Sequence, residues 1–385
     1  LEQPWAADSL EPVLAQELAE GADPDAGDEA FLGALRVFRR RQMVRIAWRD
    51  YAGWSSLEEN LGHLSELADV TIAAAVSRAH AALSLQHGEP TGADGHPLAL
   101  MVLAMGKLGG RELNFSSDVD LIFLYETGGE TDGRRPLSHE QFFARLGQRV
   151  IRFLDEPTAD GRVFRVDLRL RPFGQSGPLA MSLPAFQAYL EGHGRPWERY
   201  AYVKARPVTG WAQGVGLYRE ILDPFVYRRY LDYGLLESLR DMKSMVAEEV
   251  ARREMHDNIK LGPGGIREIE FIVQAFQLLQ GGRLPFLQHH QTMPTLAKLV
   301  QYELLREEDA RELAEAYVFL RAVEHRLQME DNRQTHSIPT DTRARLRLAR
   351  LDRRGSLDTS YQPGADAAVR AIAIQPDGAA VVGGG

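Results

Sequence analysis

The chain has 385 residues, enough for two or three domains, and its 44% hydrophobic and 26% charged residues are typical of globular proteins. Its formal charge is −9, from 45 Lys and Arg against 54 Asp and Glu, whereas a general nucleic-acid binder carries a basic excess. The absence of cysteine excludes disulfides, thiolate catalysis and cysteine-ligated zinc, and no run of about 18 apolar residues occurs, so we expect a cytoplasmic protein that binds neither nucleic acid nor membranes.

Residues 1–95 are predicted to form a helical N-terminal region. The chain starts without an initiator Met and without a signal-peptide pattern, so we expect a fragment of a longer protein. Residues 1–30 are polar and acidic, which favours loop or weak helix, and residues 31–48 combine a helical pattern with many arginines. After them, Ser56 followed by Glu59 predicts a helix start. The apolar stripe of that helix recurs at spacings of four and three: Leu57, Leu61, Leu64 and Leu67.

Between residues 96 and 210 the pattern predicts a mixed β-sheet with helices. Two continuous apolar runs, 98–105 and 121–125, are typical of buried strands. Residues 163–171 alternate between apolar and charged side chains and predict a third strand. A helix that starts after Ser138 fits between the last two strands. The expected fold class of this core is therefore α+β.

From residue 211 the pattern is helical again, and three helices are expected: 235–255, 266–280 and 306–329. We therefore divide the chain into four parts, which are the helical region 1–95, the core 96–210, a helical domain 211–350 and a tail 351–385.

The strongest chemical signal is a glycine-rich turn that two aspartates follow. A buried strand leads into Met105–Asp120, with the sequence Met-Gly-Lys-Leu-Gly-Gly-Arg-Glu-Leu-Asn-Phe-Ser-Ser-Asp-Val-Asp. Asp118 and Asp120 are two positions apart, so on a strand both carboxylates point the same way. Asp167 on the third strand would complete a triad. Carboxylate oxygens suit Mg²⁺, and two such ions about 4 Å apart would clamp the attacking and leaving oxygens of a displacement at phosphorus.

Each half of this motif is weak alone. An Asp-x-Asp pair is usually a loop cap or a solvated edge, and a lone glycine-rich turn is equally weak. The two together, directly after a buried strand and with a third aspartate on a later strand, favour a two-metal site. The sequence has no P-loop motif, and a Rossmann fingerprint fits poorly because aspartates follow the glycines where a long helix should start.

Basic and small residues near the aspartates predict a phosphate or nucleotide site. Arg169 and Arg171 share a strand face with Asp167, so we interpret them as ligands of a phosphate group; neutralisation of the acidic cluster is the alternative. Lys204 and Arg206 are weaker candidates, for which a solvated strand edge is the alternative. Free N–H groups of the glycine turn would form an anion-binding nest. The full predicted set is Gly106, Lys107, Gly109, Gly110, Ser116, Ser117, Arg169, Arg171, Lys204 and Arg206.

Beyond these physical arguments, the layout resembles the DNA polymerase β-type nucleotidyltransferase superfamily, whose motif is a Gly-Ser pair, a spacer, Asp-x-Asp and a later carboxylate. Gly106-Lys107 stands here where Gly-Ser is usual. The longer form at 105–120 resembles more specifically the N-terminal, adenylyl-removing half of the glutamine synthetase adenylyltransferase/adenylyl-removing enzymes. The resemblance covers about 30–350, and further blocks carry it: 165–172, 197–206, 259–270 and 324–328.

The resemblance implies a nucleotidyltransferase-type fold and an activity. Phosphate would attack the adenylyl phosphorus on a modified tyrosine of glutamine synthetase and release ADP, with two Mg²⁺ ions held by Asp118, Asp120 and Asp167. It also implies glutamine synthetase as a partner in the control of nitrogen assimilation and, through the full-length parent, a PII-type signalling protein. The same carboxylates would serve adenylyl transfer from ATP, and an inactive fragment that only binds its partner is a third interpretation.

Residues 351–385 do not continue the helical pattern. Val369, Ala371 and Ala373 alternate, and a Pro-Asp-Gly turn followed by Val381-Val382 predicts a β-hairpin. The segment resembles one unit of a β-propeller-type repeat, which needs stacked neighbours to bury its apolar face. We therefore expect a junction near residue 350 and a loosely docked tail that adds nothing to catalysis.

Overall fold

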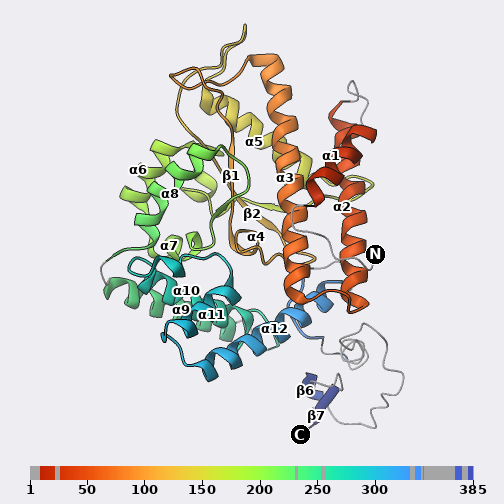
Figure 1. Cartoon of the computed structure of the whole chain (residues 1–385), viewed down its shortest axis with the longest axis vertical. Coiled ribbons are helices and arrows are strands. Elements are labelled where there is room, and N and C mark those ends of the chain that lie inside the picture. The colour runs from red at the N-terminus through yellow and green to blue at the C-terminus, as the bar shows by residue number, and fades with distance from the viewer. Residues whose placement is uncertain are drawn as a thin grey trace.

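A small mixed β-sheet with helices around it forms the centre of the molecule (Figure 1). This computed structural model describes residues 9–21, 27–229, 233–252, 257–329, 334–339, 341, 369–374 and 380–384. The α+β class expected from the sequence is confirmed. Among those residues, no helix is both long and apolar enough to cross a membrane.

Helices precede and follow the sheet along the chain. The helices are α1 (Leu10–Gly21), α2 (Asp28–Tyr51), α3 (Leu57–His87), α4 (Gly106–Gly109), α5 (His139–Asp155), α6 (Leu183–His193), α7 (Pro196–Tyr202), α8 (Ala212–Val226), α9 (Tyr233–Arg252), α10 (Ile266–Gln280), α11 (Thr292–Gln301) and α12 (Glu307–Met329). The strands are β1 (Met101–Ala104), β2 (Val119–Tyr125), β3 (Val166–Asp167), β4 (Ala180–Ser182), β5 (Arg206–Pro207), β6 (Val369–Ile374) and β7 (Ala380–Gly384). α1 lies where loop or weak helix was expected.

The helix starts follow the capping signals of the sequence. The Ser56 hydroxyl accepts a hydrogen bond from the Glu59 amide at 3.1 Å, and the Ser138 hydroxyl accepts one from the Gln141 amide at 3.2 Å. Each bond satisfies one of the amides that a first helical turn leaves without a partner. α10 begins and ends at the predicted residues, and α9 and α12 lie within a few residues of theirs.

β2 is the strand that organises the sheet. The strand order is β3-β2-β1-β5, and β4 also pairs with β2. β1 is antiparallel to β2 and to β5, whereas β3 and β4 are both parallel to β2. β3 pairs with the first residues of β2 (Val119 and Asp120), and β4 pairs with its last three. One edge of β2 is therefore shared by two short strands, and β3 lies where the Asp-x-Asp motif ends.

Both faces of the sheet are buried, which explains the continuous apolar runs. Val102 and Phe123 pack into one hydrophobic cluster with α1, α2, α3 and α5. Leu103 and Ile122 pack into a second cluster with α6, α7 and α8 on the other face. All four side chains are at most 1% exposed. In Figure 1 these two groups of helices lie on opposite sides of β1 and β2, and α9–α12 lie below them.

The third predicted strand is much shorter than expected. β3 contains only two residues, because the chain turns directly after Asp167. The Arg171 amide donates to the Leu168 carbonyl at 3.2 Å, and Phe173 and Gly174 have φ values of 60° and 56°. An extended strand over 163–171 is therefore wrong, and so is the inference that alternate residues share one strand face there.

The predicted β-hairpin is confirmed in the described part of the tail. β6 and β7 pair antiparallel as a two-stranded sheet, with Ala373 opposite Val381. The Pro-Asp-Gly turn at 376–378 and the junction expected near residue 350 lie outside the described residues.

Candidate active site

The three predicted catalytic aspartates lie where β3 pairs with the start of β2. Asp120 is the second residue of β2 and pairs in register with Asp167 of β3, and Asp118 directly precedes β2. Val119 between the two aspartates is fully buried in the core, so by the alternation of a strand its neighbours point to the other side. The parallel pairing of β2 and β3 thus brings a local motif and a distant aspartate to one place.

Gly106 lets the backbone come close to Asp120. Its φ is 54°, in the left-handed region that favours glycine. A Cβ atom built on it would lie 2.9 Å from Asp120 Oδ2. The neighbouring Met105 amide donates to the Asp120 carbonyl at 2.9 Å. A side chain at position 106 would therefore fill the space in front of the carboxylate.

The Asp120 carboxylate is electrostatically disfavoured. Burial, followed by repulsion from Asp167 and Asp118, raises the pKa of Asp120 to about 6, and the charges of Lys260 and Arg169 oppose this. The pKa of Asp167 is lowered, first by hydrogen bonds from Arg169. Three neighbouring carboxylates of which one resists ionisation are a site that a divalent cation would stabilise.

Two arginines hold the outer carboxylates. Arg165 Nε donates to Asp118 Oδ1 at 2.5 Å, and Gln334 Nε2 donates to Asp118 Oδ2 at 3.1 Å. Arg169 binds both Asp167 oxygens through Nε, at 3.1 and 2.8 Å. A cavity of about 370 Å³ lies between these side chains, lined by Asp118, Arg165, Val166, Asp167, Leu168, Arg169, Arg171 and Gln175.

The donor set fits Mg²⁺, although the side chains are not yet arranged for it. In the part of the chain that the structure describes, no group of three or more His, Asp and Glu side chains has a metal-binding geometry. Arg165 and Arg169 occupy the oxygens that a metal would need. The hard carboxylate oxygens of the three aspartates still match the ligands that Mg²⁺ prefers. Metal binding would therefore require these guanidinium groups to turn away.

α12 holds the segment that leads into Asp118. Arg321 Nη2 donates to the Asn114 side chain at 2.5 Å and also to the backbone of the same segment. Gln328 accepts a hydrogen bond from the Ser116 amide at 3.0 Å. Arg321 and Gln328 are fully buried. The helix that carries the block 324–328 thus fixes the position of the Asp-x-Asp motif.

The glycine turn is not a free anion nest. The amides of Gly109 and Gly110 donate to the carbonyls of Met105 and Gly106, both at 3.0 Å. A Cβ atom on Gly109 would lie 1.8 Å from the Lys204 carbonyl oxygen. Gly109 and Gly110 therefore close the helical turn α4 and allow tight packing, which is a different role from the phosphate contact that the sequence suggested.

Lys107 points away from the phosphate position that we expected. Its ammonium group donates to Glu324 Oε1 at 2.7 Å, and His336 Nδ1 lies 2.9 Å from the same oxygen. Burial, opposed by Glu324, lowers the pKa of Lys107 to about 7. Lys107 thus links the motif to α12.

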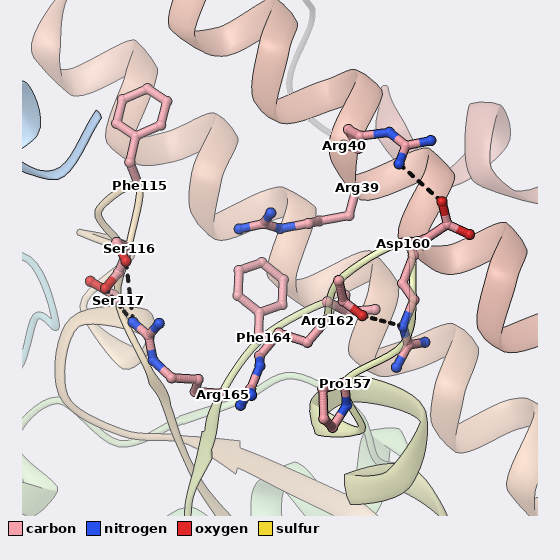
Figure 2. A pocket seen from close by; sticks show the side chains of 13 residues that line it. Arg39, Arg40, Phe115, Ser116, Ser117, Pro157, Asp160, Arg162, Phe164 and Arg165 are labelled. Atoms are coloured by element: carbon pink, nitrogen blue, oxygen red, sulfur yellow. Dashed lines mark hydrogen bonds and ion pairs between the residues drawn. The ribbon is translucent and has the colours of Figure 1, made fainter. Parts of the chain in front are cut away.

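The predicted serines and Arg171 lie at the edges of two cavities. The Ser116 carbonyl accepts from Arg165 Nη2 at 2.7 Å, and the Ser117 hydroxyl accepts from the Asn114 amide at 3.3 Å. Both serines line a second cavity next to the carboxylates (Figure 2). Arg171 lines the carboxylate cavity, and its guanidinium group donates to the carbonyls of Leu168 and Gln175 at 3.1 and 3.2 Å.

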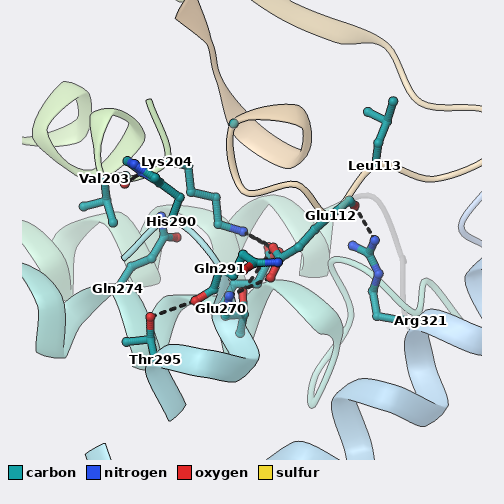
Figure 3. Close-up of polar contacts among 12 residues, drawn as sticks. Glu112, Leu113, Val203, Lys204, Glu270, Gln274, His290, Gln291, Thr295 and Arg321 are labelled. Atoms are coloured by element: carbon teal, nitrogen blue, oxygen red, sulfur yellow. Dashed lines mark hydrogen bonds and ion pairs between the residues drawn. The ribbon is translucent and has the colours of Figure 1, made fainter. Parts of the chain in front are cut away.

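Lys204 lies in a buried ionic cluster (Figure 3). Its Nζ atom donates to Glu112 at 2.8 Å and to Glu270 of α10 at 2.9 Å. Burial opposes its charge, yet the two glutamates raise the pKa of Lys204. Arg206 donates to Asp69 of α3 at 2.9 Å and to the Leu108 carbonyl of α4 at 3.1 Å. These two cations are neither solvated nor bound to Asp118, Asp120 or Asp167, so their contacts within the fold are structural.

Sequence reasoning missed two basic residues of the site. Arg165 is not among the predicted site residues, although it stands two positions before Asp167, at the same spacing as Arg169 after it. Lys260 lies in the glycine-rich loop before α10, and its charge acts on both Asp120 and Lys107. The sequence signal that could have identified Lys260 is a basic residue within a glycine-rich segment.

Comparison with known proteins agrees with this architecture. Residues 1–216 match the family model of glutamate-ammonia ligase adenylyltransferase, and residues 240–358 match that of GlnD PII-uridylyltransferase. A bifunctional glutamine synthetase adenylyltransferase/adenylyl-removing enzyme of Thioalkalivibrio sulfidiphilus is 55% identical over 325 residues, which are 84% of this chain and 34% of the relative. A protein of the same name from Nitrosococcus oceani is 53% identical over 317 residues, 82% of this chain and 33% of the relative.

The chain thus spans about a third of the length of these relatives. The first family match covers more than half of the chain and contains Asp118, Asp120 and Asp167. It also covers the whole mixed sheet of β1 to β5. The chain belongs to the glutamate-ammonia ligase adenylyltransferase family.

Proposed function

We propose that this chain removes the adenylyl group from adenylylated glutamine synthetase. The observation that carries this proposal is the register pairing of Asp120 with Asp167, with Asp118 beside them at the edge of a basic cavity. The names of both relatives include adenylyl removal beside adenylyl transfer, which supports this class of reaction. The choice of removal over transfer rests on the resemblance carried by residues 105–120. Because the chain spans only a third of these proteins, the activity of the whole relative comes to it only as a proposal.

The proposed reaction is a displacement at phosphorus. An oxygen of inorganic phosphate forms a bond to the adenylyl phosphorus, the bond from phosphorus to the tyrosine oxygen breaks, and tyrosinate and ADP are the products. Tyrosine has a pKa of about 10, so its anion is a better leaving group than a serine alkoxide. Two Mg²⁺ ions held by Asp118, Asp120 and Asp167 would supply Lewis-acid stabilisation of the phosphoryl charge.

The protein's own side chains orient the phosphoryl group. Arg169 is 75% exposed in its side chain and borders the cavity, so it is available to bind a phosphoryl oxygen once it leaves Asp167. Arg171 borders the same cavity. Asp120 would bind a metal ion only in its ionised form. That form is favoured when a bound cation offsets the negative charges of Asp167 and Asp118.

The partners follow from the proposed reaction. Adenylylated glutamine synthetase is the protein substrate, and phosphate and ADP are the small substrate and product. The second family match names a PII-uridylyltransferase, which supports a PII-type signalling protein as a partner of the longer parent. A cytoplasmic location belongs to the same proposal.

A direct assay tests the reaction. We expect ADP and unmodified tyrosine when the purified chain is incubated with adenylylated glutamine synthetase, phosphate and Mg²⁺. Asp120→Asn should release no ADP, whereas Asp241→Asn on α9 should react at the wild-type rate. The proposal fails if the folded wild-type chain binds Mg²⁺ but forms no ADP.

The opposite direction is the second candidate, because the relatives are named as bifunctional. Incubation with ATP, Mg²⁺ and unmodified glutamine synthetase would then give pyrophosphate and the adenylylated tyrosine. A chain that binds glutamine synthetase without turnover in either assay would instead be a binding module. Calorimetric titration with Mg²⁺, repeated on Asp118→Ala/Asp120→Ala, shows whether the carboxylates hold metal at all.

A further inference from the structure

A second cavity lies next to the carboxylate site, and Arg165 lines both. It has a volume of about 350 Å³. Its walls come from α2, from the segment before Asp118 and from the segment before β3 (Figure 2). Three parts of the chain that are far apart in sequence thus enclose a space beside the proposed reaction centre.

The lining of this cavity is strongly basic. It contains one aspartate, Asp160, and five arginines: Arg36, Arg39, Arg40, Arg162 and Arg165. Three of the arginines are satisfied within the fold. Arg36 donates to backbone carbonyls, among them that of Gly161 at 2.9 Å. Arg40 pairs with Asp160 at 3.0 Å, and Arg162 pairs with an aspartate outside the lining at 2.7 Å.

Arg39 is different from its neighbours. Its Nε atom is buried, and Arg39 makes no hydrogen bond or ion pair within the described residues. Its guanidinium carbon lies 5.7 Å from the ring centre of Phe164. Figure 2 shows it extending from α2 across that ring toward Ser116 and Ser117. Burial, and then the charge of Arg165, lower the pKa of Arg39. The positive charge of Arg165 is thus near enough to act on Arg39.

We propose that this cavity binds inorganic phosphate between Arg39 and Arg165, with the Ser117 hydroxyl as a further donor. Arginine forms paired hydrogen bonds to phosphate oxygens, and a partly buried site strengthens them. The Ser117 oxygen accepts from the Asn114 amide, so its proton is available to the ligand. The binding itself follows from the cavity alone; the role of the ion as the attacking phosphate rests on the proposed function.

The aromatic lining favours a free phosphate over a nucleotide. The face of Phe164 is covered by Arg39. Phe115 packs edge-to-face with His325, with ring centres 5.1 Å apart and an interplanar angle of 84°, and only 4% of it is exposed. A nucleobase would need an open aromatic face for stacking, and these two rings do not offer one.

The position suits a co-substrate. Arg165 donates to Asp118 through Nε and to the Ser116 carbonyl through Nη2. A phosphate bound at this guanidinium group therefore lies one side chain away from the carboxylates. It would also compete with Asp118 for Arg165, so that binding of the anion frees a metal ligand.

Calorimetric titration of the full chain with inorganic phosphate, in a metal-free buffer without other oxyanions, tests the site. We expect saturable binding by the wild type and at least a tenfold weaker affinity for Arg39→Gln, because a charged hydrogen-bond donor is lost. Arg40→Gln is the matched control, since Arg40 borders the same cavity but is paired with Asp160. Its affinity should remain within about threefold of the wild type.

Two results would overturn the proposal. One is the absence of phosphate binding at millimolar concentrations, or an equal affinity of Arg39→Gln and wild type. The other is Arg39-dependent binding of AMP or ADP at least tenfold tighter than phosphate, which would assign the cavity to a nucleotide. If Arg39→Gln does not fold, Arg39→Lys keeps the charge without the paired hydrogen bonds and should bind phosphate several-fold more weakly than wild type; an unchanged affinity rejects the site.

Failure of the site and failure of the proposed function give different results. Arg39-dependent phosphate binding without ADP release from adenylylated glutamine synthetase keeps the site and rejects the function. ADP release with the same KM for phosphate in wild type and Arg39→Gln keeps the function and rejects the site.

Discussion

The Asp120 carboxylate carries a charge that the metal-free fold disfavours, and this gives a stability prediction. Its pKa is raised from 3.8 to about 6, so the ionised form destabilises the fold above pH 6, and the penalty disappears when pH falls below about 4. Asp120→Asn should therefore raise the free energy of unfolding at pH 7 by up to about 3 kcal/mol. Thermal melting in the presence of a chelator should show a gain at pH 7 that shrinks toward pH 4.

Asp69→Asn is the control, because this substitution should lower the stability of the fold and not raise it. The Asp69 carboxylate pairs with Arg206 at 2.9 Å, and neither side chain is more than 18% exposed. The substitution removes the negative charge that balances a largely buried arginine, so the melting temperature should fall. Equal destabilisation by both substitutions would show that Asp120 is not repelled by its neighbours.

Arg165 occupies an oxygen that a metal ion would use, so its removal should favour metal binding. Arg165→Gln removes both the competing guanidinium group and a positive charge next to Asp118. A partly exposed ion pair contributes about 1 kcal/mol, so we expect about fivefold tighter Mg²⁺ binding in calorimetry. Arg162→Gln, which breaks a pair with Asp155 instead, should leave the affinity unchanged. Weaker Mg²⁺ binding by Arg165→Gln would mean that the arginine positions Asp118 for the metal.

The positions of the aspartates could be predicted from the sequence, but the partners of the cations could not. A spacing of two around a buried strand residue predicts that Asp118 and Asp120 lie near each other, although only Asp120 belongs to β2 and Asp118 directly precedes it. The partner of a long basic side chain depends on distant elements. Lys204 meets Glu270 only because α10 packs beside α7, and no local pattern contains that information.

Lys204 joins Glu112 of the motif at 105–120 to Glu270 of α10. We therefore predict that the attachment of α10 to the core depends on this buried lysine. Lys204→Met leaves two buried carboxylates without their cation, which typically costs 3–5 kcal/mol. We expect the melting temperature to fall by about 10 °C. Lys243→Met on the exposed side of α9 should change it by less than about 2 °C. If Lys204→Met instead keeps the melting temperature and raises the KM for phosphate, Lys204 binds substrate as the sequence suggested.

Helices were easier to predict than short strands for a physical reason. α5 has its own capping serine and an apolar face. Its first residue and the face that it turns to the core are therefore both encoded locally. β3 consists of two residues, and its length is set by pairing with β2 and by the turn after Asp167. An alternating segment that ends in a turn has the same sequence pattern as a longer strand.

The described parts of the molecule suggest which part of the chain the proposed chemistry needs. The two large hydrophobic clusters pack on opposite faces of the five-stranded sheet, with α1–α3 and α5 in one and α6–α10 in the other. β6 and β7 form a separate sheet of two strands that pair with each other. Such a hairpin has marginal stability alone and adds no strand to the sheet that carries Asp120 and Asp167.

Removal of the tail should therefore leave the proposed active site intact. We expect a chain that ends at Arg350 to keep the melting temperature and the Mg²⁺ affinity of the full chain, as measured by calorimetry. The family match extends to residue 358, so a second chain that ends at Asp358 is the matched control. If only the shorter chain loses stability, residues 351–358 belong to the helical domain and the junction lies after them. If both chains unfold, or if both keep their fold but lose Mg²⁺ binding, the hairpin is part of the working domain, because a strand pair without contacts to the core could have neither effect.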